Sequence, residues 1–377
     1  MSKTKKWKRK FLKMIKKWNF STVEFGSIRK IVQVIFFVTV ILIGYRFYSF
    51  TIQLEAGIIP DIDRPPGIEG FLPISALISL KYYFQTGIIN DIHPSGLLIF
   101  LFISAFSILI KKSFCSYVCP IGFLSEMLTR IHLKIFKKGL RVNRFIDYPL
   151  RLIKYCLLIF FVYTIFFKMN GFVIKQFLYS SYNIIADIKM LMFFTDISMT
   201  AAIIIISLII LSVFIRNFWC RYLCPYGAFL GLLSFFSPFK IRRDEEACVS
   251  CEKCDEVCPS SINVSKSRNI ISDECFACGK CIDACPSKGT LSLSLPGKKF
   301  RLKPVIVSIV AVFIFLGGSF LARHTGNWQN NISKKDYLNY MVENGLINIH
   351  KIQDLDKFIE HLDKRRKRMF MKQMMEK

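Results

Sequence analysis

The sequence predicts a polytopic α-helical membrane protein, with about five spans, two re-entrant or half-helix segments and an internal repeat, that carries one small α+β domain. Apolar residues make up 53% of the chain, Phe alone contributes 37 residues, and the mean hydropathy is +0.39. These values are typical of membrane proteins. Several apolar stretches have the length that a bilayer crossing needs. A cysteine-rich stretch before the last of them predicts the small domain.

The charge of the chain also indicates a membrane. A formal net charge of +27 would suggest nucleic-acid binding in a soluble protein. Here the Lys and Arg residues lie mostly in blocks beside apolar stretches, so the positive-inside rule accounts for most of the charge. We therefore expect a membrane, and no nucleic acid, as the partner of these residues. Thirteen cysteines indicate a reducing compartment around the cysteine-rich part.

The N-terminal segment, 1–30, holds eleven Lys or Arg against one acid, Glu24. We expect a basic amphipathic helix on the cytoplasmic surface of the membrane. The first apolar span follows at about 31–50 and is long enough to cross a hydrocarbon core of roughly 30 Å. No small-residue cleavage site follows it, which predicts an uncleaved anchor.

The first membrane repeat, 31–150, continues through a segment with few cations, 51–94, which predicts the outer face. The apolar run Phe71–Phe84 within it is short and is broken by Lys81, so we expect a re-entrant half-helix. The stretch Leu97–Ile110 then crosses back.

A second membrane repeat, 151–239, follows with an offset of 105 residues. The shared pattern is Ser107-x-x-Ile110-Lys111-x-x-Phe114-Cys115-x-Tyr117-x-Cys119-Pro120-x-Gly122 and Ser212-x-x-Ile215-Arg216-x-x-Trp219-Cys220-x-Tyr222-x-Cys224-Pro225-x-Gly227. Spans at 152–167 and 199–215 flank an irregular outer segment, 168–197. A parallel repeat puts both Cys-x3-Cys-Pro motifs on one side. Ten Lys or Arg against two acids in 111–154 predict that this side is the cytoplasm.

The segment 240–302 holds eight cysteines in two copies of one spacing. The runs are Cys248-x2-Cys251-x2-Cys254-x3-Cys258-Pro259 and Cys275-x2-Cys278-x2-Cys281-x3-Cys285-Pro286. Three thiolates two residues apart wrap three corners of a cubane iron–sulfur cluster from one loop, so the fourth ligand comes from elsewhere. Zinc sites favour separated cysteine pairs, and disulfides suit small secreted domains.

This stretch resembles the two-cluster bacterial ferredoxins, in which the fourth cysteine of each run serves the other cluster. We therefore predict a cytoplasmic α+β domain with two 4Fe–4S clusters. The ligand sets are Cys248, Cys251, Cys254 and Cys285 for one cluster, and Cys275, Cys278, Cys281 and Cys258 for the other.

Four more cysteines form the two Cys-x3-Cys-Pro pairs, Cys115 with Cys119 and Cys220 with Cys224. Proline directly after a cysteine favours a break between two helices. One interpretation is that the four thiols converge across the repeat and hold a further iron–sulfur centre or act as a redox relay. The alternatives are a disulfide in each pair, which a reducing cytosol disfavours, or small residues that pack the turn. Cys156, alone in an apolar span, is expected in the core.

Among other polar residues, His93 at the end of a span suits a quinol or haem site, although an ordinary loop histidine is the simpler interpretation. We assign no role to His132 or His324, and expect Asp187 and Asp196 at helix ends. The sequence has no Gly-rich dinucleotide loop after a strand and no P-loop.

The last span is expected at 303–322, and the tail, 323–377, on the outer face. Ser333 and Asp336 have the spacing of a helix cap, and Gly345 is expected to end that helix. Leu355, Phe358, Ile359 and Leu362 form the apolar stripe of a second tail helix.

The doubled Cys-x3-Cys-Pro motif, the ferredoxin-like runs and the spans between them resemble the membrane-bound polyferredoxins of the NapH/NosR/CcoG type. The stretch Arg64–Pro73 is also similar to this family. The resemblance covers about residues 30–322. It implies electron transfer in the bacterial inner membrane, in the NapH case from quinol toward a periplasmic reductase, with the quinone pool and a redox protein as partners.

The resemblance leaves three functions open. NapH-like proteins imply a quinol dehydrogenase or oxidoreductase subunit, whereas the NosR-like and CcoG-like branches imply assembly or maintenance of a metalloenzyme. A redox sensor is the third alternative. The sequence has no flavin-attachment motif, so the NapH branch is the nearer resemblance.

Overall fold

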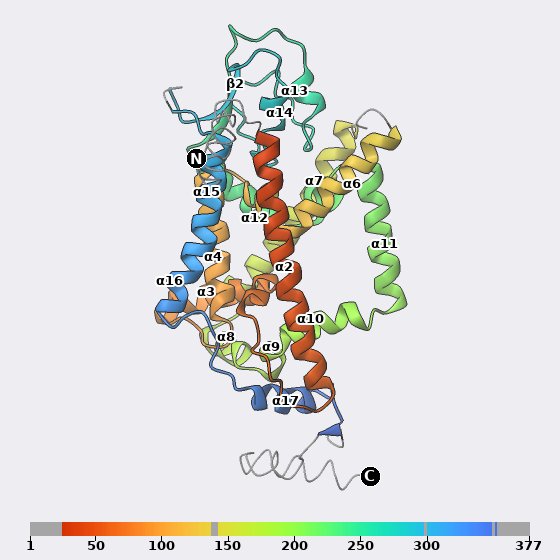
Figure 1. Ribbon diagram of the computed structural model, residues 1–377, viewed down its shortest axis with the longest axis vertical. Helices are drawn as coiled ribbons and strands as arrows, with labels where there is room; N and C mark the ends of the chain where they lie inside the picture. The colour runs from red at the N-terminus through yellow and green to blue at the C-terminus, as the bar shows by residue number, and fades with distance from the viewer. Residues whose placement is uncertain (1–24, 137–141, 298–299, 349–350, 353–377) are drawn as a thin grey trace, which may run out of the picture.

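The structure is a computed structural model that describes residues 25–136, 142–297, 300–348 and 351–352. The expected N-terminal amphipathic helix lies almost wholly outside these ranges, and the expected second tail helix lies outside them entirely. The described part is a helical body with the small cysteine-rich domain at one end of its long axis. The tail helix α17, Lys334–Glu343, lies at the other end (Figure 1).

Three helical stretches are long and apolar enough to cross a membrane. They are α2 (Phe25–Glu55), α7 (Arg144–Tyr163) with η2 (Thr164–Lys168), and α15 (Pro304–Val312) with η5 (Phe313–Gly317) and α16 (Gly318–His324). A fourth candidate is the pair α10 (Ala186–Thr195) and α11 (Met199–Phe214), which bends by 81°.

The sequence predicts two more crossings than these three continuous helices provide. One of them, α4 (Pro94–Leu109), has 16 residues, or about 24 Å at 1.5 Å per residue. This is shorter than a hydrocarbon core of roughly 30 Å. The described residues therefore support three to four candidate spans, and five spans stay a prediction.

The first half-helix segment consists of η1 (Pro66–Phe71) and α3 (Pro73–Thr86), and α3 ends at Gly87 in the left-handed conformation, with φ of 71°. Lys81, which interrupts the apolar run in the sequence, is buried. Its Nζ donates to three carbonyls at the end of η2, at 2.6 to 3.0 Å. The lysine therefore satisfies helix-end acceptors that would otherwise lack donors.

The prediction of an irregular segment at 168–197 is wrong. This stretch folds into α8 (Gly171–Leu178), α9 (Ser181–Ile184) and α10. The physical reason is side-chain capping, because Asn170 and Ser180 accept hydrogen bonds from backbone N–H groups in the first turns of α8 and α9.

Each Cys-x3-Cys-Pro motif lies at a break between two helices, as its proline predicts. The helices are α5 (Phe114–Tyr117) and α6 (Pro120–Phe136) in the first repeat, and η3 (Trp219–Leu223) and α12 (Pro225–Leu233), followed by η4 (Ser234–Phe236), in the second. The proline is the first residue of α6 and of α12, where its missing N–H costs nothing.

A buried charge network joins the two repeats at the end of the body opposite the cysteine-rich domain. Arg64 donates through Nε to Asp187 at 2.6 Å and through Nη1 to Glu69 at 2.7 Å. His93 lies beside them, with Nε2 2.7 Å from the Asn183 carbonyl oxygen and Nδ1 3.4 Å from Glu69. These contacts tie η1 and the start of α4 to α9 and α10.

The tail helix packs on this network. Its cap forms as the sequence predicts, because Ser333 Oγ accepts from Asp336 N at 3.1 Å. Gly345 follows the helix with φ of 70°. Tyr337 lies beneath the Arg64 guanidinium, 5.7 Å from ring centroid to Cζ, in a hydrophobic cluster with Phe50 from the end of α2.

The described part of the cysteine-rich domain contains one antiparallel pair, β1 (Lys240–Arg243) and β2 (Leu291–Ser294), in which Lys240 faces Ser294. Two one-turn helices, α13 (Lys253–Glu256) and α14 (Lys280–Asp283), lie between the strands in sequence. The domain is therefore α+β, as predicted.

An ion-pair triad joins this domain to the helical body. Glu126 on α6 accepts from Arg29 on α2 at 2.7 and 2.9 Å, and Lys280 on α14 lies 3.2 Å away. Burial alone would raise the pKa of Glu126, but the hydrogen bonds from Arg29 and the charge of Lys280 lower it to about 2.

Replacing Glu126 by Gln should destabilise the protein by about 3 kcal/mol, because it leaves the fully buried Arg29 without its carboxylate. Thermal unfolding in detergent measures this. Replacing Arg130, which pairs with Glu126 from an exposed position, should change stability by less than about 1 kcal/mol. Equal effects of the two substitutions would contradict the assignment. Because the pKa is lowered, the stabilisation persists at neutral pH and is lost as the pH falls from the ordinary value of 4.5 toward 2.

Candidate iron–sulfur sites

The two predicted ligand sets surround two separate cavities. We call Cys248, Cys251, Cys254 and Cys285 the distal set, and they line one cavity together with Arg243, Thr290 and Leu291. We call Cys258, Cys275, Cys278 and Cys281 the proximal set, and they line another cavity with Ile241, Ile262 and Ile270. Each cavity thus combines three cysteines from one run with the fourth from the other.

The two cavities differ in exposure. Both sets include buried cysteines, Cys254 in the distal set and Cys258 and Cys275 in the proximal set, but the exposed cysteine of the eight, Cys251, belongs to the distal set. Burial raises the pKa of the Cys258 thiol to about 12. The pKa of Cys248 is lowered by backbone and side-chain hydrogen bonds, first from Ser250 and then from Arg243. Iron binding displaces the thiol proton of each ligand, and this proton is held more firmly at Cys258 than at Cys248.

Both cavities fit a cubane cluster by their donor sets, because each offers four thiols from two loops. Within the described ranges, no three His, Cys, Asp or Glu side chains gather closely enough to hold a single metal ion. A cubane is ligated at separate iron corners, so its thiolates need not converge on one point.

The first repeat holds the loop that carries Cys275. Lys111 Nζ donates to the carbonyls of Ile270 and Ser272 at 3.0 and 2.9 Å, and Ser116 Oγ donates to the Phe276 carbonyl at 2.9 Å. Lys111 lies just before the first Cys-x3-Cys-Pro motif, and Ser116 lies within it.

The second repeat holds the loop that carries Cys258. Arg216 Nη1 donates to the Glu256 carbonyl at 3.2 Å, and Arg221 Nη1 donates to the Ser260 carbonyl at 2.5 Å. The two arginines stand 105 residues after the donors of the first repeat. Equivalent positions of the two repeats therefore hold the two loops of the proximal set, which faces the helical body.

The four remaining motif cysteines lie next to the proximal set. Cys115 and Cys220 line one small cavity with Cys278, so the two repeats come together there. Burial raises the pKa of Cys115, and its neighbours Cys119, Cys220 and Cys224 raise it further. All four thiols are thus close enough to influence one another.

A steric constraint explains why glycine stands at position 122, just after the first motif. A Cβ atom at Gly122 would lie 1.9 Å from the Cys115 carbonyl oxygen. Only glycine lets α6 approach the preceding cysteine turn this closely.

Lys112 is a fully buried cation beside these thiols. Its Nζ has no hydrogen-bond partner among the described residues and lies 5.2 Å from the centroid of the Phe276 ring. Burial lowers the pKa of Lys112, but the nearby negative charges of Glu274, Cys115 and Asp273 raise it overall, so the buried ammonium group lies beside anionic groups and beside the motif thiols.

The structure also places the other sequence candidates. Cys156 is exposed on α7, so the expectation of a core position is wrong: α7 turns Lys154 and Tyr155 toward Glu274 and Asp273 and leaves Cys156 on the other side. The remaining candidates are His93 and His132, both buried, Asp187 in the first turn of α10 and Asp196 at its end, and His324 in the last turn of α16.

Sequence reasoning missed the residues that dock the cysteine-rich domain. Lys111 and Arg216 belong to the repeated pattern, in which the cysteines predict a site and the basic residues predict only sidedness. Their equivalence in the two repeats was the available signal.

The fold and these cavities define a mostly helical protein with three to four candidate membrane spans and a ferredoxin-type domain. A family described as "4Fe-4S binding domain" matches twice, at residues 92–141 and 197–244, and one described as "4Fe-4S dicluster domain" matches residues 240–286. The first two matches begin 105 residues apart, the same offset as the sequence repeat.

Similar proteins include the putative electron transport protein YccM of Escherichia coli, which is 38% identical over 315 residues, 82% of this chain and 88% of that protein. The methylamine utilization ferredoxin-type protein MauN of Methylobacillus flagellatus is 26% identical, over 64% of this chain and 80% of that protein. The ferredoxin-type protein NapH of Haemophilus influenzae is 26% identical, over 41% and 50%. No solved structure matches. The chain belongs to this family of ferredoxin-type electron transport proteins with 4Fe–4S domains.

The crossed ligand sets predict which cluster each cysteine serves. Replacing Cys285 by Ser should alter the EPR spectrum of the same cluster as replacing Cys248 by Ser, although the two cysteines belong to different runs. Cys156→Ser should leave both clusters unchanged, because Cys156 lies on the exposed face of α7. If Cys285→Ser instead altered the cluster that Cys281→Ser alters, the crossing would be rejected.

Proposed function

We propose that this protein relays electrons between the quinol pool of the bacterial inner membrane and a redox partner through two 4Fe–4S clusters, one at the proximal set and one at the distal set. The cysteine-rich domain faces the cytoplasm in this proposal. The main observation in support of this proposal is that the two cavities differ in position. The proximal cavity lies against the helical body, and the distal cavity includes the exposed Cys251.

This difference orders the relay. Bound clusters supply one-electron carriers whose potentials depend on burial, charge and hydrogen bonds. Lys111 and Lys112 lie buried on the side of the proximal set that faces the helical body, and positive charge stabilises the reduced, more anionic state. A protein partner can approach the distal set at its exposed cysteine, Cys251. Electrons therefore pass from the membrane to the proximal set, then to the distal set and the partner, or along the same path in the reverse direction.

The four thiols of the Cys-x3-Cys-Pro motifs extend the relay toward the membrane in this proposal. We assign a further iron–sulfur centre to Cys115, Cys119, Cys220 and Cys224. The mutual proximity of the thiols, and their proximity to the buried ammonium group of Lys112, support the assignment. The cavity that Cys115 and Cys220 share with Cys278 makes the centre a neighbour of the proximal set.

A partner on the outer face would lie about 30 Å from the clusters, across the hydrocarbon core. The further centre would lie on the same side of the membrane as the two clusters. It would therefore shorten the distance to an outer partner only on the cytoplasmic side. Delivery to an outer reductase would therefore need another carrier, from a separate subunit or from a cofactor in the half-helix segments.

Iron content tests the further centre. Anaerobically purified protein should contain more than about eight irons per chain, the number that two cubanes hold. A variant with Cys115, Cys119, Cys220 and Cys224 changed to Ser should contain about eight and should lose one set of EPR signals. About eight irons in both proteins, with unchanged spectra, would leave only two cubanes.

Rapid mixing with a reduced quinol analogue tests the relay itself. Each quinol that is oxidised releases two protons and two electrons, so the visible absorbance of the clusters should bleach as they take up the electrons. Cys156→Ser should bleach at the same rate as the unmodified protein. Absence of bleaching, together with co-purification of an apo-metalloenzyme, would contradict the relay and favour an assembly or maintenance factor.

A further inference from the structure

Tyr117 is a fully buried tyrosine whose hydroxyl group has no hydrogen-bond partner among the described residues. It is the last residue of α5 and stands between the two cysteines of the first Cys-x3-Cys-Pro motif. Buried polar groups in proteins are normally hydrogen-bonded, so an exception calls for an explanation. The electron relay proposed above assigns no role to this hydroxyl group.

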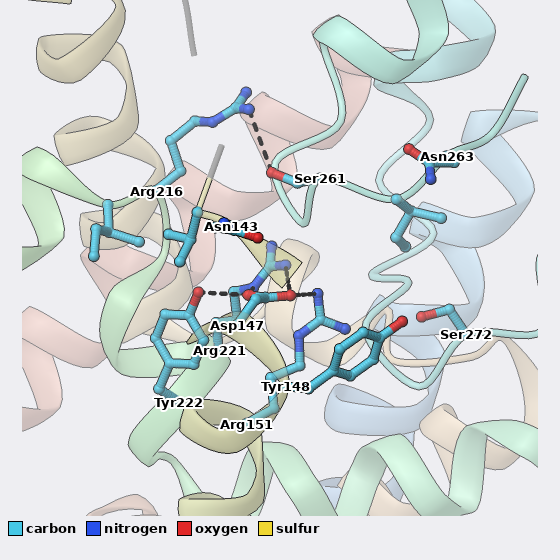
Figure 2. A pocket seen from close by; sticks show the side chains of 13 residues that line it. Asn143, Asp147, Tyr148, Arg151, Arg216, Arg221, Tyr222, Ser261, Asn263 and Ser272 are labelled. Carbon is cyan, nitrogen blue, oxygen red and sulfur yellow. Dashed lines mark hydrogen bonds and ion pairs between the residues drawn. The ribbon is translucent and has the colours of Figure 1, made fainter. Parts of the chain in front are cut away.

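The equivalent tyrosine of the second repeat does have a partner. Tyr222 stands 105 residues after Tyr117, and its hydroxyl group donates to Asp147 at 2.6 Å. Figure 2 shows the Tyr222 side chain directed at this carboxylate, which also pairs with Arg151 and Arg221. The protein therefore supplies an acceptor for the hydroxyl group in one repeat and none for its counterpart within the described residues.

Tyr117 lies beside the loop that carries two cysteines of the proximal set. The preceding residue, Ser116, donates through Oγ to the Phe276 carbonyl at 2.9 Å. Phe276 stands between Cys275 and Cys278 in the sequence. Tyr117 also belongs to the same hydrophobic cluster as Cys275. Both observations place the tyrosine against the proximal set.

The charges around Tyr117 indicate which cysteine is near its hydroxyl group. Burial raises the pKa of Tyr117, the charge of Arg29 lowers it, and the charges of Cys278 and Asp283 raise it. Asp283 accepts a hydrogen bond from Gly26 N at 2.7 Å and makes none with Tyr117. The other negative group, Cys278, is a predicted ligand of the proximal cluster.

Two more donors without acceptors lie in the same neighbourhood, on α2. Arg29 Nε and Gln33 Nε2 are buried and have no hydrogen-bond partner among the described residues. Arg29 Nη1 donates to the carbonyl of Ser116 at 3.1 Å, directly before Tyr117 in the chain. An excess of buried donors favours a group that accepts hydrogen bonds. The sulfur atoms of an iron–sulfur cluster are such acceptors.

We propose that the Tyr117 hydroxyl group donates a hydrogen bond to a sulfur atom of the proximal cluster, at or beside Cys278. This inference deepens the proposed function, because it rests on a 4Fe–4S cluster at the proximal set. A hydrogen bond to sulfur strengthens as the cluster gains negative charge on reduction. It therefore raises the reduction potential of the cluster that lies against the helical body.

EPR-monitored redox titration of the full chain tests the hydrogen bond. Tyr117→Phe removes the hydroxyl group and keeps the ring, which packs against Phe106 with 6.5 Å between the centroids. The equilibrium constant for one-electron reduction of the proximal cluster should fall about tenfold, or about 59 mV, while that of the distal cluster stays unchanged. Tyr222→Phe removes the equivalent hydroxyl group, which Asp147 accepts, and should leave both potentials unchanged.

Deuterium exchange adds a readout that a packing role of the tyrosine would not produce. In D₂O, ENDOR spectra of the unmodified protein should show an exchangeable deuteron coupled to the reduced proximal cluster. This coupling should be absent from Tyr117→Phe and retained in Tyr222→Phe. Cys281→Ser and Cys248→Ser assign the EPR signals to the proximal and distal sets, and equal iron content verifies that both tyrosine variants bind their clusters.

Unchanged potentials and an unchanged deuterium spectrum in Tyr117→Phe would overturn the proposal. Absence of an exchangeable coupling from the proximal cluster of the unmodified protein would overturn it whatever the variant does. Dithionite reduces the clusters in both experiments, so neither requires quinol. A protein that shows the coupling and the shift but does not react with quinol would support the hydrogen bond and contradict the relay alone.

Discussion

Buried cations that donate to backbone carbonyls hold the cysteine-rich domain on the helical body. Lys111 and Arg221 reach into the domain from the two repeats, and each satisfies carbonyl groups of a cysteine-bearing loop. A buried charge is tolerated only when it is paired or hydrogen-bonded. The loop carbonyls therefore stabilise the buried charge of Lys111, and Lys111 in turn satisfies these carbonyls. This mutual requirement fixes which side of the domain faces the body.

The orientation has consequences for electron transfer. If the domain were docked by its other side, the exposed Cys251 would face the body and the buried Cys258 would face solvent. As it is, the proximal set lies beside the Cys-x3-Cys-Pro motifs, and Cys278 shares a cavity with Cys115 and Cys220. The motif cysteines of the helical body thus adjoin the proximal set, whereas the distal set contains the exposed Cys251.

The opposite end of the body uses the same principle with different residues. Arg64 is buried between Glu69 and Asp187, and the tail helix covers it with Tyr337. The network joins both repeats and the tail, so the repeats are held together at both ends of the body. Between these ends, much of the helix surface is apolar and exposed, as a lipid environment requires.

The sequence by itself determined the elements whose signals are local. The spacing of the eight cysteines predicted two crossed sets, Pro120 and Pro225 predicted the helix breaks, and Ser333 with Asp336 predicted the cap of α17. The 105-residue offset predicted a repeat from identities along the chain alone. The helix breaks and the cap depend on neighbours within a few residues. The cysteine runs and the repeat are recognised from spacing and identities along the chain.

The tertiary structure decided what depends on contacts between distant residues. Lys81 interrupts an apolar run in the sequence, yet it satisfies carbonyls more than eighty positions away. Cys156 lies in an apolar span but faces outward, because Lys154 turns the other face of α7 toward Glu274. Which side of the cysteine-rich domain meets the body follows from pairing between segments that no local pattern encodes. Burying a charge requires a partner, and only the folded chain supplies it.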